Sequence, residues 1–363
     1  MSILLFFLIL LLLVIAHEFG HFIVAKFFKI RVDEFAFGFP PRIFSIKKGE
    51  TNYSFNALPI GGYVSIYGEN ALLVQDDADK ARAFSAKSRW IQSAVIVAGV
   101  IFNLILAWIL ISSTLMIGIA SPVDNDEGYP VQNAHLMITQ LAAKGPAETA
   151  GLKSGDTIMT LSDGTETVTA DSPGAVSSFI GTREGKEIML TYTRKGEEGQ
   201  IRVTPVMGIS KEHAAIGIYM DMVGTLKLPF FAALADGGMK TYQFTKFTAV
   251  GIYTFIYQAV TGNADYSQVT GPVGIVGAVG EAAGIGFANL ILFTALISIN
   301  LAVINIIPFP ALDGGRFLFI LIEGITRKPM KPQIANAMNF VGFALLMLLM
   351  VAVTYHDIAK LVH

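Results

Sequence analysis

Near its start the chain carries ILLFFLILLLLVIAHEFGH, residues 3–21. Residues 3–16 hold no polar side chain, and His17, Glu18 and His21 then follow within about one helical turn. Two imidazoles four residues apart lie on one helix face and can bind a zinc ion, and the adjacent carboxylate can act as a general base. Because polar groups are costly in a membrane helix, three together indicate a functional site. The stretch predicts a metal site inside a membrane helix.

The composition is that of a membrane protein. Of 363 residues, 53% are apolar and only 15% are charged, and the mean hydropathy is +0.57. The formal net charge of −2 gives no reason to expect nucleic acid as a partner. The sequence contains no cysteine, which excludes disulfides and thiolate metal sites. Any metal must therefore be held by His, Asp or Glu.

Apolar segments long enough to span a bilayer, which takes about 20 residues, occur four times. They are residues 3–28, 93–118, 287–307 and 334–354. The first lacks the basic start and the small-residue cleavage site of a signal peptide, so we expect a retained helix. The third continues through a break to about residue 325. We predict a polytopic α-helical membrane protein whose core is built from residues 1–120 and 287–363.

Between these two parts the composition changes to that of a soluble domain. Short β-type runs separated by glycine-rich turns are His135–Gln140, Thr157–Leu161, Ile188–Thr193 and Gln200–Val206. Among them stands Gly145-Pro-Ala-Glu-Thr-Ala-Gly-Leu-Lys-Ser-Gly-Asp-Thr-Ile158, which resembles the PDZ pattern of a short helix, a tight turn and a strand. We predict a PDZ domain over 121–225. PDZ domains bind peptides at a sheet edge, but the peptide-binding residues stay unassigned here and a purely steric role is the alternative.

The segment 226–286 combines apolar runs with scattered charges. Its large apolar side chains recur at near-helical spacing, at Phe244, Phe247, Ile252, Phe255 and Ile256. This pattern favours amphipathic helices lying on the membrane surface. A fifth spanning helix at 245–260 is the alternative, although that segment is short for a bilayer.

An uncharged segment of alternating polar and apolar residues lies between the first two spanning helices. Residues 51–68, TNYSFNALPIGGYVSIYG, are centred on Leu-Pro-Ile-Gly-Gly, which predicts a β-hairpin turning there. Because it lacks charge, the hairpin could dip into the membrane beside the metal site. A hairpin on the protein surface fits the pattern equally well.

A zinc site with two histidines usually takes a third protein ligand and leaves the fourth position for water. Asp236, Glu281 and Glu323 are candidates by residue type. Asp313 differs from them because it follows two prolines and precedes two glycines, at a break in an apolar run. Irregular backbone at membrane depth is tolerated where it lines a cavity. We therefore expect Asp313 as the third ligand, while Asn305 could satisfy backbone groups that the break frees or could contact substrate.

Gly99 and Asn103 lie four residues apart on one face of the second spanning segment. Glycine permits close helix contact, and an asparagine in a membrane helix usually hydrogen-bonds a partner. Simple helix packing would account for both residues.

Together these motifs resemble the site-2 protease family of intramembrane zinc metalloproteases, and within it the RseP-type bacterial enzymes. The resemblance is carried by the PDZ pattern and by His17-Glu-Phe-Gly-His21, Gly99-Val-Ile-Phe-Asn103 and Asn305-Ile-Ile-Pro-Phe-Pro-Ala-Leu-Asp-Gly314. It spans nearly the whole chain. One PDZ pattern is recognisable here, whereas the longer members of the family have two, so a substrate-gating scheme based on a tandem pair does not carry over.

The resemblance implies a function and a set of roles. Zinc would be bound by His17, His21 and Asp313, with Glu18 as the base. Supporting positions would be Asn305, Asn103, Gly99 and Gly314. A sheet edge facing the substrate would fall on Tyr53, Phe55, Gly61, Gly62 and Tyr63. The expected reaction is hydrolysis of peptide bonds in or near the spanning segment of a single-span membrane protein, such as an anti-sigma factor already trimmed outside or a remnant signal peptide.

The distribution of Lys and Arg predicts the topology. The loop 29–92 and the connection 316–331 carry many of these residues and should face the cytoplasm. The N-terminus, the PDZ domain and the C-terminus would then lie outside a bacterial inner membrane, with the metal nearer the cytoplasmic face. The lipid bilayer is thus an expected partner, and the oligomeric state stays open.

Other functions fit only parts of the pattern. A catalytically inactive scaffold that captures proteins through its PDZ domain would not need Glu18. A metal transporter would need a chain of ligands across the membrane, whereas the sequence indicates one site.

Overall fold

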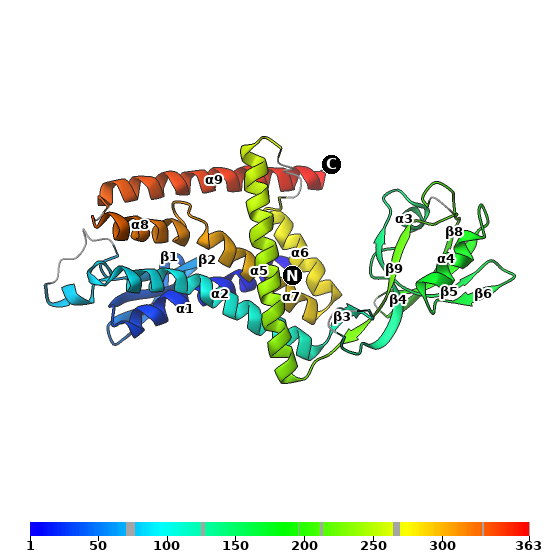
Figure 1. Cartoon of the computed structure of the whole chain (residues 1–363), viewed down its shortest axis with the longest axis horizontal. Coiled ribbons are helices and arrows are strands. Elements are labelled where there is room, and N and C mark those ends of the chain that lie inside the picture. Colours follow the sequence, from blue (N-terminus) through cyan, green and yellow to red (C-terminus); the bar gives the residue numbers. More distant parts are fainter. Residues whose placement is uncertain are drawn as a thin grey trace. The chain divides into compact units, whose positions relative to one another are not determined.

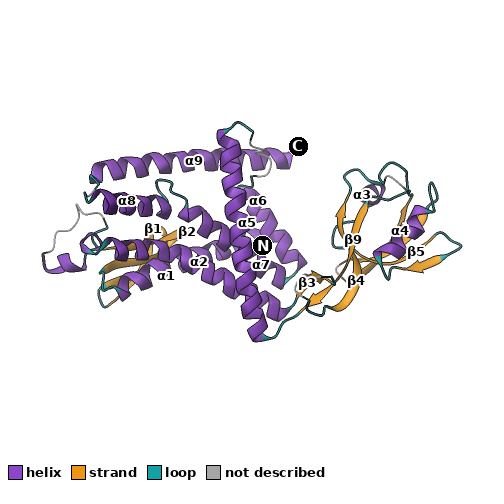
Figure 2. Ribbon diagram, in the orientation of Figure 1, coloured by secondary structure: helices purple, strands orange, loops and turns teal. Residues whose placement is uncertain are grey.

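The computed structural model describes residues 1–69, 77–124, 128–194, 196–210, 213–263, 269–328 and 330–362. The chain forms two compact units. One consists of Met1–Thr114 with Phe230–His363, and the other of Leu115–Pro229. The first unit holds the long helices and a small sheet, and the second is rich in strands (Figures 1 and 2).

The helical unit contains, in the described part of the chain, four helices that are long and apolar enough to cross a membrane. They are α1 (Ser2–Phe27), α2 (Arg89–Ile117), α7 (Phe287–Ile306) and α9 (Pro332–Val362). These helices cover the four predicted segments. Only 6% of the most apolar stretch of α9 is buried inside the protein, as expected for a helix whose surroundings are lipid.

The predicted break after α7 separates it from α8 (Asp313–Thr326). Pro308 and Pro310 lack a backbone N–H and cannot continue a helix. Ala311 adopts a left-handed φ of 76°, and its amide donates to Oδ1 of Asn339 on α9 at 3.3 Å. The break therefore sets the point at which α8 begins, which is Asp313.

The loop between α1 and α2 folds into a sheet of β1 (Val32–Lys48) and β2 (Thr51–Ile66). The prediction of a hairpin within 51–68 is wrong in its pairing. Residues 52–55 and 62–65 do not pair with each other, because both pair with residues 34–37 of β1. The tight turn lies instead at Gly49, where φ is 65°. Two short 3-10 helices, η2 (Asp77–Arg82) and η3 (Phe84–Ala86), then lead into α2.

This pairing leaves two edges of the sheet without a further described strand, at residues 62–66 and at residues 44–48. Residues 62–66 pair with β1 on one side, and no other described strand joins this sheet. We refer to residues 62–66 as the open edge. Whether the sheet enters the membrane stays a prediction.

The segment predicted to be a surface linker forms α5 (Phe230–Val260) and α6 (Pro272–Ile285). α5 runs across the direction of α1, α2 and α9 (Figure 1). Its first half packs on α2, where the Trp108 indole N–H donates to the Leu234 carbonyl at 2.8 Å. Its second half exposes aromatic side chains, among them Phe247 at 80% and Tyr253 at 72%. α5 is not among the four spanning candidates of the described chain, and its place on the membrane surface stays a prediction.

The second unit is a sheet with the strand order β3-β9-β4-β5-β7-β8 and with β6 paired to β5. The strands are β3 (Ile119–Pro122), β4 (Gln132–Leu141), β5 (Thr157–Ser162), β6 (Thr167–Thr169), β7 (Ile188–Arg194), β8 (Glu197–Val203) and β9 (Ile218–Leu226). Two helices complete it, α3 (Pro146–Ala150) and α4 (Pro173–Gly181). Alternating strand residues form its core, including Leu136, Ile138, Ile188 and Leu190, each no more than 1% exposed. All four predicted β-type runs overlap strands of this sheet.

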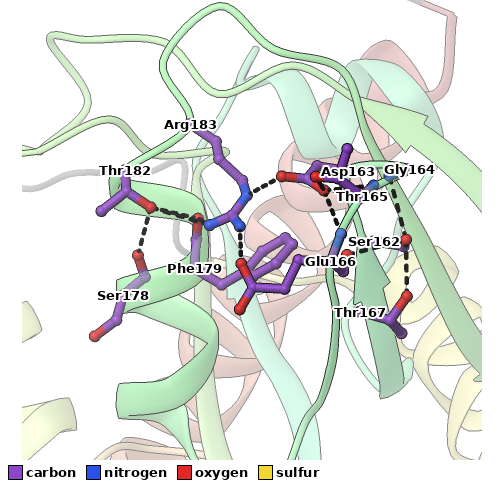
Figure 3. A network of polar contacts seen from close by, with 10 residues as sticks. All are labelled: Ser162, Asp163, Gly164, Thr165, Glu166, Thr167, Ser178, Phe179, Thr182 and Arg183. Carbon is purple, nitrogen blue, oxygen red and sulfur yellow. Dashed lines mark hydrogen bonds and ion pairs between the residues drawn. The ribbon is translucent and has the colours of Figure 1, made fainter.

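Asp163 ties the β5–β6 turn to the end of α4 (Figure 3). Its carboxylate accepts hydrogen bonds from the Thr165 hydroxyl at 2.7 Å, the Glu166 amide at 2.8 Å and Arg183 Nε at 2.7 Å. The guanidinium of Arg183 also stacks over the Phe179 ring, 3.6 Å from its centre. The Thr165 hydroxyl, the Glu166 amide and Arg183 hold the pKa of Asp163 well below its usual range.

This shift predicts a pH dependence. Because the pKa is lower in the folded state, ionised Asp163 stabilises the unit above the usual carboxyl pKa of about 3.9, and the contribution is lost as the pH falls below that value. The measurement is hydrogen exchange of the β5 and β6 amides in the whole chain, corrected for intrinsic rates. On acidification, we expect this corrected exchange to accelerate more in wild type than in Asp163→Asn. Asp171→Asn, which removes another carboxylate of the same unit, should behave as wild type. Equal acceleration in wild type and Asp163→Asn would contradict the assignment.

Candidate metal centre

Polar atoms from α1 and α8 converge in the helical unit. The Nε2 atoms of His17 and His21 lie 3.3 Å apart, and Oδ2 of Asp313 lies 3.0 Å and 3.2 Å from them. His17 is 9% and His21 is 7% exposed. Within the described residues this is the one group of three His, Asp or Glu side chains arranged to hold a metal. The structure brings together the three residues expected as ligands.

The spacing of these atoms suits zinc. Ligand atoms about 2.0–2.2 Å from a tetrahedral zinc lie about 3.3–3.6 Å from one another, close to the distances between the three atoms here. Oδ2 of Asp313 is buried and makes no hydrogen bond within the described structure. Lone pairs gathered at such distances repel one another unless a cation or shared protons lie between them. The donor set and its spacing therefore fit a zinc ion.

Hydrogen bonds on the far side of each imidazole orient the rings. Nδ1 of His21 lies 2.8 Å from the Val95 carbonyl, so it carries the proton and leaves the Nε2 lone pair facing the centre. Nδ1 of His17 lies 3.3 Å from the amide nitrogen of Asn103, while the amide oxygen of Asn103 is buried without a partner. The side-chain carboxamide of Asn103 can be rotated so that its oxygen and its nitrogen exchange places. We assign the orientation in which the oxygen faces Nδ1 of His17. Asn103 then accepts from Nδ1 and selects the same tautomer as at His21.

Glycines let the helices approach closely enough for this arrangement. A Cβ on Gly99 of α2 would lie 2.5 Å from Nε2 of His21 and 2.7 Å from Cε1 of His17. A Cβ on Gly20 of α1 would lie 2.5 Å from the Ala98 carbonyl oxygen. Gly99 therefore does more than permit helix packing, because it leaves the space that both imidazoles fill. Gly314 acts similarly in α8, where a Cβ would overlap the carbonyls that end α7.

Glu18 lies between the cluster and the sheet. The backbone of Gly62 comes so near that a Cβ there would be 3.8 Å from Cγ of Glu18. The expected base is thus placed next to the open edge.

The remaining expected site residues do not all lie at the open edge or beside the cluster. Of the five expected edge residues, only Gly62 and Tyr63 belong to the open edge. Tyr53 and Phe55 lie on the opposite side of residues 34–37, where the Phe55 ring stacks on Phe44 at 5.5 Å, so their assignment to the edge is wrong. Asn305 is half-buried in the last turn of α7, and no hydrogen bond joins it to the cluster in the described structure.

The second unit contains a groove that the sequence interpretation left unassigned. A cavity of about 270 Å³ lies between α4 and the start of β9, lined by residues that include Ser177, Ile180 and Met220. At its end stands the triplet Ile216-Gly217-Ile218, where Gly217 has a φ of 80°. The first residues of β9 pair with β4, whereas β3 pairs only further along. An edge beside a helix suits the addition of a peptide strand, and the apolar-Gly-apolar triplet is the signal that could have located it.

Gly99→Ala tests the space that holds the imidazoles. The added methyl group would displace both rings, so we expect zinc affinity to fall by about 100-fold or more, as when groups that orient ligands are lost. The measurement is competition with a chelator on the purified chain. Gly277→Ala on α6, where a Cβ meets no atom within 4 Å, is the matched control. Equal affinity of the two variants would refute the role given to Gly99.

Known proteins similar to this chain point to one family. The model of Peptidase family M50 matches residues 5–349. A protein of Clostridium acetobutylicum is 34% identical over 347 residues, covering 95% of this chain and 94% of the relative. Zinc metalloprotease RasP of Oceanobacillus iheyensis and regulator of sigma-W protease RasP of Bacillus subtilis are each 30% identical, covering 96% of both chains in each comparison.

Among solved structures, the PDZ domain of an SdrC-like protein from Listeria monocytogenes is 20% identical, covers 25% of this chain and 93% of its own, and has a TM-score of 0.22. The family match extends over nearly the whole chain and includes all three residues of the cluster. The chain belongs to peptidase family M50, the site-2 protease family of zinc metalloendopeptidases.

Proposed function

We propose that this protein hydrolyses peptide bonds in or near the spanning segment of single-span membrane proteins, using zinc held by His17, His21 and Asp313. The observation that carries the proposal is the convergence of these three side chains beside Glu18, within a unit that has four helices apolar enough to cross a membrane. A soluble protease would not need such surroundings.

The centre has the parts that peptide hydrolysis requires. Zinc, when bound, acts as a Lewis acid that acidifies water and polarises the peptide carbonyl. Glu18 accepts a proton from the attacking water and later returns it to the amine nitrogen as the C–N bond breaks. The Val95 carbonyl and Asn103 keep both imidazoles in the tautomer that presents Nε2.

The substrate has to be unwound before it reacts. In a helix each carbonyl is already hydrogen-bonded, and an unwound chain at membrane depth needs new partners for its backbone. The open edge can provide them by strand addition, and the close approach of the Gly62 backbone to Glu18 supports this role.

The substrates we propose are membrane proteins already trimmed on the extracytoplasmic side, such as an anti-sigma factor, or remnant signal peptides. The N-terminus, the PDZ-like unit and the C-terminus would lie outside the membrane, and the centre nearer the cytoplasm. The groove beside β9 would receive a chain end exposed by trimming, whereas a purely steric unit would exclude untrimmed proteins.

Glu18→Gln tests the reaction. Glutamine cannot accept the proton, so we expect cleavage of a single-span substrate to fall by about 100- to 10,000-fold. Zinc content should not change, because Glu18 is not a ligand. The assay uses purified protein in detergent or vesicles. Cleavage that survives in Glu18→Gln would overturn the mechanism, and bound zinc with no cleavage by wild type would favour a scaffold.

Val64→Pro tests the open edge. Proline removes a backbone N–H donor from the open edge, so we expect cleavage to fall by about tenfold or more, because the substrate is no longer held in an attack geometry. Val64→Ala keeps the amide and serves as the control, with zinc content measured in both. Equal cleavage by the proline and alanine variants would argue against strand addition at this edge.

A further inference from the structure

A cavity of about 830 Å³ lies in the helical unit, and its lining includes Ala311 and Arg316, which flank Asp313 in the sequence. Its walls come from α8, α9, the first turns of α2 and the end of β2, and its lining includes Ser65, Arg89, Arg316, Glu323, Ala335 and Asn339. The volume falls in the range of about 300–1,000 Å³ typical of pockets that enclose a ligand.

Two elements, α8 and the open edge, extend from the metal centre to this cavity. On α8, Asp313 and Arg316 are three residues apart and share a helix face, and Arg316 lines the cavity. On the open edge, Gly62 lies beside Glu18, while Ser65 and Ile66 line the cavity. A strand advances about 3.3 Å per residue. A chain paired with the open edge at Glu18 therefore reaches the cavity roughly three residues further along.

The lining combines apolar side chains, among them Phe319 and Phe343, with four charged ones. Arg316 of α8 forms an ion pair with Glu69, just beyond β2. Arg89 Nη1 of α2 lies 2.6 Å from Glu323 Oε2, and the other oxygen of Glu323 accepts from the Met330 amide at 2.8 Å. These charged groups offer donors and acceptors to a polypeptide, and covering them with an apolar helix or a lipid tail would carry a desolvation cost.

We infer that this cavity binds the polar segment that flanks the apolar stretch of the substrate, a few residues from the bond that is cut. The inference rests on the proposed function and adds a recognition site for it. The open edge would hold the unwound residues at Glu18, and the cavity would hold the adjoining polar residues. Such remote binding improves the reaction at the cut bond by fixing its position.

The absence of cysteine from the chain allows a selective test. Ala335 of α9 lines the cavity, whereas Ala337, two residues along the same helix, is exposed and does not. Each is replaced by cysteine in the full chain and labelled with a bulky maleimide. Two single-span substrates are compared, one with its polar flank intact and one shortened so that the flank is missing. Zinc content is measured in parallel.

The label at Ala335→Cys should slow cleavage of the substrate with the intact flank by about tenfold or more relative to unlabelled protein. Cleavage of the shortened substrate should change by less than about twofold. The label at Ala337→Cys should affect neither substrate, and zinc content should be equal throughout.

An equal loss for both substrates, or no loss at Ala335→Cys, would overturn the inference and leave the proposed function intact. Failure of the unlabelled cysteine variants and wild type to cleave either substrate would overturn the proposed function and this inference with it.

Discussion

The close crossing of α1 and α2 is the constraint on which the centre depends. Gly20 meets the Ala98 carbonyl, and Gly99 faces the two imidazoles. Any larger residue at Gly99 would occupy the space of the rings. The same closeness brings the Val95 carbonyl to His21 and Asn103 to His17, so the polar groups that burial makes costly are partnered within the two helices.

The position of Asp313 depends on a different feature of the fold. Asp313 is the first residue of α8, where the helix dipole favours a carboxylate. Its position follows from the break after α7, and two residues of α9 contact this break. Asn339 accepts the Ala311 amide, and the backbone of Gly342 approaches the Pro310 carbonyl so closely that a Cβ would overlap it. Thus α9, which is mostly exposed to its surroundings, helps to position Asp313 on α8.

A hydrolytic centre among apolar helices also needs water and an extended chain. The open edge approaches Glu18 at Gly62, and the cavity is lined by Arg316 in the first turn of α8. Their ion pairs keep polar groups partnered within the unit. Charged side chains can therefore line a site in a unit whose long helices are mostly apolar.

The sequence by itself determined the four apolar helices, the β-rich insertion and the cluster of His17, His21 and Asp313. Residues 3–28 are long and apolar enough to predict a membrane helix, and His17, His21 and Asp313 stand out because such groups are costly there. The residues of the small sheet were harder to interpret. Alternation in 51–68 indicates strands but not their partners, and pairing with residues 34–37 depends on long-range contacts. Only the tertiary structure could decide that Gly62 belongs to the open edge and Phe55 does not, or that Gly99 makes room for imidazoles. A local sequence pattern indicates which side chains of a segment are buried. The residues that each side chain contacts depend on segments that are distant in the sequence.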